Sequence, residues 1–113
     1  MHELSIATSI IEQAEEFARK YKAEKITRID LEVGQFTGVV IDSLKFALEF
    51  AVKDTILEKA KVEIIEIKGK TECNACQTIF DNPDWYTPCP ACGSMDFKVS
   101  GGEELQIKSI YTG

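Results

Sequence analysis

Two pairs of cysteines are the residues of this chain with the clearest chemical potential. One pair is Cys73 and Cys76, the other is Cys89 and Cys92, and the chain has no further cysteine. Each Cys-x2-Cys pair forms a tight knuckle whose sulfurs reach one metal ion, and two knuckles complete a tetrahedral four-thiolate site. Such a site favours zinc and leaves no coordination position open for a substrate. The spacing therefore predicts a structural metal site.

Other uses of the four cysteines stay open at this point. Iron in a rubredoxin-like site takes the same four ligands, and a pair of disulfides would also consume them. Gly93 stands where a knuckle needs a left-handed backbone, while the first knuckle has Gln77 there. The segment around the cysteines has few large apolar side chains, so we expect metal binding to supply its folding free energy.

The amino terminus is the second candidate site. His2 is the only histidine and lies beside the amine of Met1. The amine, the deprotonated amide and the imidazole would form fused chelate rings, and planar nitrogen coordination is typical of Ni(II) or Cu(II). Glu3 would add a carboxylate or orient the imidazole. The alternative is a solvated histidine at a frayed chain end.

Length and charge limit the remaining function classes. The 113 residues correspond to one domain, or one domain with a small insert. A formal net charge of −6 argues against nucleic-acid binding, which needs a cationic face. No apolar run approaches the roughly 18 residues of a membrane span, and no basic region precedes a long apolar stretch. We therefore expect no signal peptide, no membrane association, and a cytoplasmic, reducing location.

Apolar periodicity predicts the elements that position these sites. Spacings of three and four predict helices over 4–21 and 40–57, and alternation predicts strands over 26–34, 61–70 and 104–111.

Individual residues within the two helices give further expectations. Leu4 and Tyr21 belong to the apolar stripe of the first helix, and Phe46 and Phe50 widen the stripe of the second. Asp42 or Ser43 is expected to cap the second helix.

These elements predict an α+β fold. A three-stranded sheet would carry two helices on one face, with a four-cysteine zinc-ribbon-like insert before the last strand. The strands before and after the insert are expected to pair, because the compact insert joins them. Residues 1–70 with 102–113 would form an α/β domain that binds nickel, and 71–101 a zinc-binding domain. Lys68–Lys70 and Gly101–Gly102 would be the hinges between them.

The start Met-His-Glu-Leu-Ser, an amphipathic helix and a four-cysteine ribbon together resemble the HypA/HybF family of nickel metallochaperones. The resemblance extends over essentially the whole chain, including 29–34, 44–48 and 104–110. It implies a protein that binds Ni(II) at its amino terminus and delivers it during maturation of NiFe-hydrogenase and, in some organisms, of urease.

The same resemblance implies roles for particular residues and partners. The Met1 amine and His2 correspond to the nickel ligands, and Glu3 to a residue that supports them. The structural zinc ligands correspond to Cys73, Cys76, Cys89 and Cys92. The partners would be a nickel-handling GTPase and the hydrogenase large subunit. The chain would be a monomer, with a homodimer left open.

Three competing functions remain at this stage. A zinc ribbon for nucleic acid or a transcription complex fits the cysteine spacing, although the acidic balance of 71–100 opposes it. A small redox protein with iron at the four thiolates also fits the ligands. An enzyme is the weakest reading, because the sequence has no Ser/His/Asp set, no Gly-rich phosphate loop and no second histidine.

Overall fold

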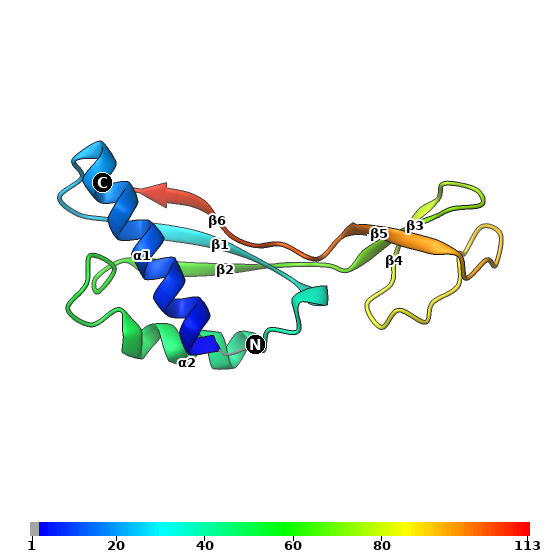
Figure 1. Ribbon diagram of the computed structural model, residues 1–113, viewed down its shortest axis with the longest axis horizontal. Coiled ribbons are helices and arrows are strands. Elements are labelled where there is room, and N and C mark those ends of the chain that lie inside the picture. Colours follow the sequence, from blue (N-terminus) through cyan, green and yellow to red (C-terminus); the bar gives the residue numbers. More distant parts are fainter. Residues whose placement is uncertain (1–2) are drawn as a thin grey trace. The chain divides into compact units, whose positions relative to one another are not determined.

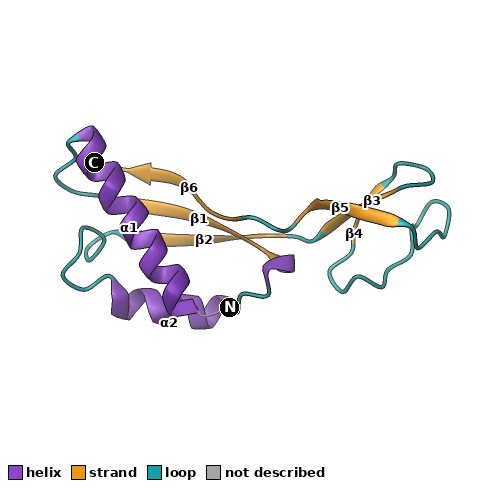
Figure 2. Ribbon diagram, in the orientation of Figure 1, coloured by secondary structure: helices purple, strands orange, loops and turns teal. Residues whose placement is uncertain are grey.

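The computed structural model describes residues 3–113, and Met1 and His2 lie outside the described residues. The elements are, in order, α1 (Glu3–Tyr21), β1 (Arg28–Gly34), the 3-10 turn η1 (Gln35–Thr37), α2 (Ile41–Ala51), β2 (Lys61–Ile67), β3 (Lys70–Cys73), β4 (Ile79–Asp81), β5 (Phe97–Gly101) and β6 (Leu105–Tyr111). Figures 1 and 2 show the two helices and the two three-stranded sheets of the described residues. The predicted α+β class is confirmed.

The chain divides into two compact units. The first contains the described part of Met1–Glu32 together with Gly38–Ile65 and Gln106–Gly113. The second contains Val33–Thr37 and Glu66–Leu105. No helix of residues 3–113 is long and apolar enough to cross a membrane.

The larger sheet has the order β2-β1-β6. The N–H of Thr27 donates to Tyr111 and the N–H of Gly34 donates to Glu104, so β1 and β6 run antiparallel. At the other edge of β1 the N–H of Lys61 donates to the Thr27 carbonyl, which joins the start of β2 to the start of β1. A start-to-start contact is the arrangement of parallel strands, and α2 is the crossover between them.

This order shows that one predicted pairing is wrong. The strands on either side of the cysteine segment, β2 and β6, do not pair with each other, because β1 lies between them. The physical reason is burial: Ile29 and Leu31 are at most 1% exposed, whereas β2 and β6 have no fully buried residue. The strand that buries its side chains most completely is therefore the central one.

Both helices cover one face of this sheet. The buried stripe of α1 consists of Ile6, Ala7, Ile10, Ile11, Ala14 and Ala18. From α2, Leu44 and Leu48 complete this core, and the two helices also pack against each other. Four residues that were expected in the apolar stripes are instead exposed, by 60% to 64%: Leu4, Tyr21, Phe46 and Phe50. A helix buries only the stripe that faces its sheet, so apolar residues beside that stripe remain in solvent.

The second helix is shorter than predicted. It ends at Ala51 rather than at residue 57, and a series of turns follows it. Asp54 has a φ of 62°, a left-handed conformation that an α-helix cannot continue through. The residue that caps the start of α2 by position is Val40, and its side chain makes no capping hydrogen bond. Neither Asp42 nor Ser43 therefore has the predicted capping role.

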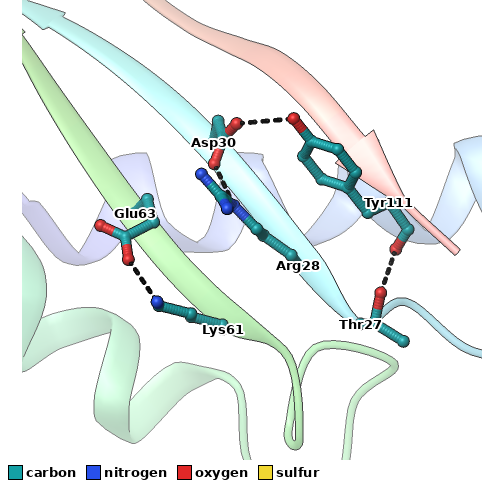
Figure 3. Close-up of polar contacts among 6 residues, drawn as sticks. All are labelled: Thr27, Arg28, Asp30, Lys61, Glu63 and Tyr111. Carbon is teal, nitrogen blue, oxygen red and sulfur yellow. Dashed lines mark hydrogen bonds and ion pairs between the residues drawn. The ribbon is translucent and has the colours of Figure 1, made fainter. Parts of the chain in front are cut away.

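A polar network lies on the face of the sheet away from the helices (Figure 3). Asp30 is only 5% exposed, and its two carboxylate oxygens accept hydrogen bonds from the Arg28 Nε at 2.8 Å and the Tyr111 hydroxyl at 3.2 Å. Arg28 also lies over the Tyr111 ring, 5.2 Å from its centroid. On β2, Lys61 and Glu63 form an ion pair at 3.0 Å. The network ties the last strand to the centre of the sheet.

Candidate metal centre

A small antiparallel sheet, β4-β3-β5, carries the cysteines. The predicted strand over 61–70 is in fact two strands, and the second of them, β3, ends at Cys73. On one side of β3, Cys73 pairs with Phe97 of β5. On the other side, Thr71 pairs with Phe80 of β4. Cys73, Phe80 and Cys89 form a buried cluster against which Phe97 packs. The first cysteine of each pair is therefore held by the core of this unit.

The two knuckles have the same backbone geometry. In the first, the N–H of Gln77 donates to the Cys73 carbonyl at 2.8 Å, and the N–H of Cys73 donates to Thr78 at 2.9 Å. In the second, Gly93 donates to Cys89 at 2.8 Å, and Cys89 donates to Ser94 at 2.9 Å. The residue after each knuckle is left-handed as expected, with φ of 61° at Gln77 and 75° at Gly93.

The knuckles bring all four sulfurs together. They lie within 4.8 Å of one another, and the Cys73–Cys92 and Cys76–Cys89 sulfur pairs are each 3.6 Å apart. A zinc–sulfur bond of about 2.3 Å in a tetrahedron requires sulfurs roughly 3.8 Å apart. All four cysteines are free thiols, which removes the disulfide alternative for this structure. The donor set therefore fits a tetrahedral thiophilic metal ion.

Cys73 and Cys89 are buried, whereas Cys76 and Cys92 are exposed. The Thr78 hydroxyl lies 3.2 Å from the Cys76 sulfur. That hydroxyl and the Thr78 backbone N–H lower the pKa of Cys76 to about 6. At Cys92 the Ser94 N–H acts to lower the pKa, but interaction with the Cys73 thiol and loss of hydration outweigh it and raise the pKa to about 12.

A loop over 82–87 is fixed by a buried asparagine. Asn82 is fully buried, and its amide donates to the Thr71 hydroxyl and the Thr87 carbonyl, while its oxygen accepts the Thr87 N–H. The loop holds Trp85 in a stack with Phe36, with ring centroids 4.3 Å apart, and a second stack with Phe97 at 6.3 Å. The only tryptophan of the chain is thus tied to the strand that pairs with Cys73.

Two glycines that were predicted as hinges have a packing role. A Cβ on Gly69 would lie 2.5 Å from carbons of the Phe36 ring, and a Cβ on Gly102 would lie 2.6 Å from the Cα of Gly69. Gly102 also accepts the N–H of Phe36 at 2.7 Å. These glycines allow the turn after β1 to pack into the cysteine-bearing unit.

The amino-terminal candidate site lies largely outside the described residues. Met1 and His2 are not described, and Glu3 is the half-buried first residue of α1. A carboxylate in the first turn interacts favourably with the positive end of the helix dipole.

Sequence patterns predicted neither the hydroxyl of Thr78 beside the Cys76 sulfur nor the aromatic stack of Phe36 on Trp85. A threonine two residues after the second cysteine of a pair was a visible signal for the Thr78 hydroxyl. The stack of Phe36 on Trp85 joins residues far apart in the chain, and no local pattern predicts it.

The fold and the four-sulfur cluster define a small α+β protein with a metal-binding ribbon. Comparison with known families is more specific: the family described as hydrogenase/urease nickel incorporation, metallochaperone, HypA matches residues 1–112. The chain belongs to this HypA family.

Individual relatives agree with this assignment. The chain is 46% identical to the hydrogenase maturation factor HypA of Parabacteroides distasonis over 110 residues, covering 97% of this chain and 96% of the relative. It is 41% identical to the protein of that name from Prosthecochloris aestuarii, covering 97% of each. The solution structure of the Ni metallochaperone HypA from Helicobacter pylori matches with a TM-score of 0.69 at 28% identity, covering 99% of this chain and 97% of that one.

Proposed function

We propose that this protein is a nickel metallochaperone for hydrogenase maturation, and not an enzyme. It binds one Ni(II) through the Met1 amine and the His2 amide and imidazole, with Glu3 as a supporting carboxylate. The observation that carries the proposal is the family match, which begins at residue 1 and so includes this start. Nitrogen-rich planar coordination suits Ni(II), and a site made by few residues at a chain end suits release.

The four cysteines form a structural zinc site in this proposal. The sulfur spacing supports it, and a closed set of four thiolates offers no position for a catalytic water. Residues 71–101 are the zinc-binding part, and residues 1–70 with 102–113 are the nickel-binding part. Zinc binding supplies folding free energy that the small core of the ribbon lacks.

Nickel passes by ligand exchange to a partner in the cytoplasm. The receiving proteins are a nickel-handling maturation GTPase and the hydrogenase large subunit, and the chaperone is a monomer. Nucleic acid is not a partner, because the chain has a net charge of −6.

Complementation tests the proposed function. In a bacterium that lacks its own HypA, the parent chain should restore hydrogenase activity, and His2→Ala should not, although both accumulate equally. His2→Ala removes the imidazole ligand and leaves every described contact in place. Equal restoration by both proteins would contradict the nickel-donor role of the amino terminus.

A further inference from the structure

The two exposed sulfurs of the cysteine cluster differ in their hydrogen-bond donors. At Cys76 the thiol donates a hydrogen bond to the Thr78 hydroxyl oxygen at 3.2 Å, and the backbone N–H of Thr78 also interacts with the sulfur. At Cys92 the corresponding backbone N–H is that of Ser94, and the Cys73 sulfur lies 3.6 Å away. Among the described residues, no side-chain hydroxyl forms a hydrogen bond with the Cys92 sulfur.

The difference between Thr78 and Ser94 is built into the two knuckles. Both residues occupy the same place, since each accepts the N–H of the first cysteine of its pair. The Ser94 hydroxyl instead accepts the N–H of Asp96 at 3.0 Å, which orients it toward the following turn. Of the two knuckles, the first is therefore the one that holds a hydroxyl in hydrogen-bond contact with its exposed sulfur.

A bound thiolate has no proton, so the Thr78 hydroxyl must be the donor once Cys76 is a metal ligand. A hydrogen bond to an ionised group is stronger than a neutral one, and it withdraws electron density from the sulfur. Of two otherwise equivalent thiolates, the one that accepts a hydroxyl hydrogen bond is thus the weaker nucleophile. Cys73 and Cys89 are buried and take no part in this comparison.

We propose that Thr78 anchors Cys76 as the less reactive exposed ligand, and that Cys92 is the ligand through which the metal site opens to electrophiles and competing ligands. Thr78 is a positioning residue in this account. The inference rests on the proposed four-thiolate zinc site, and it adds an order of reactivity within that site.

Alkylation of the zinc-loaded protein by limiting iodoacetamide tests the order. The sulfur lone pair forms the new carbon–sulfur bond while the carbon–iodine bond breaks and iodide leaves. Peptide mass spectrometry then gives a rate for each cysteine. In the parent protein Cys92 should be modified before Cys76, and this result needs no variant. Modification of Cys76 first would overturn the proposal.

Variants separate the hydroxyl from the general structure of the knuckle. Thr78→Val should raise the Cys76 rate by about three- to tenfold, as expected for the net loss of one hydrogen bond. Thr78→Ser should restore the parent rate. Ser94→Ala is the matched control from the second knuckle and should leave the Cys76 rate unchanged. An unchanged Cys76 rate in Thr78→Val, or a Thr78→Ser protein that behaves like Thr78→Val, would overturn the proposal.

Metal content distinguishes this failure from a failure of the proposed zinc site. Zinc measured in the same samples should be about one ion per chain. If the parent protein holds no zinc, the four-thiolate assignment itself is wrong. If zinc is present and the order of reactivity is not as stated, only the role of Thr78 is wrong.

Discussion

Individual residues of the metal centre follow from the sequence where the backbone itself dictates the residue type. Two Cys-x2-Cys pairs predict two knuckles, and the left-handed positions at Gln77 and Gly93 were predicted from their place after each pair. The Thr78 hydroxyl was not predicted, because a side chain two residues from a ligand reaches the sulfur only in a particular rotamer. Hydrogen-bond partners of this kind depend on the folded backbone.

Gly93 gives a prediction at this scale. Its φ is 75° and a Cβ would meet no atom within 4 Å, so Gly93→Ala changes only the backbone preference. A left-handed non-glycine residue costs about 1 kcal/mol. Because the proposed zinc site couples metal binding to folding, zinc affinity should fall by roughly fivefold in competition with a chromophoric chelator.

Gly38→Ala is the matched control for this variant. Gly38 has the same φ of 75° and the same empty surroundings, but it belongs to the unit without the cysteines. Gly38→Ala should lower the free energy of unfolding of the unit without the cysteines and leave zinc affinity unchanged. Equal zinc affinities for the parent and Gly93→Ala would contradict the account.

At the scale of elements, periodicity predicted the helices and the strands of the larger sheet, but not the order of these strands. Alternation in 26–34 and 104–111 shows that strands exist, while the order depends on which strand buries most apolar surface. Here that strand is β1, so β2 and β6 are both edges. The second sheet was missed because its strands have only 3 to 5 residues, too few for a period to appear.

The polar network on the open face of the larger sheet gives a prediction about β6. Tyr111→Phe removes the hydroxyl that donates to Asp30 and leaves the ring under Arg28. The free energy of unfolding in urea should fall by about 0.5–1.5 kcal/mol, as for one hydrogen bond to a buried acceptor.

Tyr86→Phe provides the comparison for Tyr111→Phe. Tyr86 is 78% exposed, so the loss of its hydroxyl should change stability by a few tenths of a kcal/mol at most. Equal effects of the two substitutions would show that the Tyr111 hydroxyl does not stabilise the sheet.

At the scale of the whole molecule, the chain forms two compact units with separate cores. The unit with the cysteines has a buried cluster of only Cys73, Phe80 and Cys89, with Phe97 packed against it. The unit with the helices has its own larger apolar core. We therefore expect the stability of the unit with the cysteines to depend on metal, and the stability of the unit with the helices to be independent of metal.

Metal removal tests this division. After treatment with a strong chelator, Trp85 should lose its stacks with Phe36 and Phe97, and its fluorescence should shift to longer wavelength. The circular dichroism at 222 nm should stay nearly constant, since α1 and α2 belong to the other unit. Added zinc should reverse the fluorescence change. Loss of the helical signal together with the tryptophan shift would contradict independent stability.

The proposed function requires two metals bound at two separate sites. The most direct measurement is metal content with a nickel titration on untagged protein with its native amino terminus, beside His2→Ala. We predict about one zinc in both proteins, and one nickel bound by the parent alone. Nickel bound equally well by His2→Ala would contradict the account of the amino terminus, and a folded parent without zinc would contradict the account of the four cysteines.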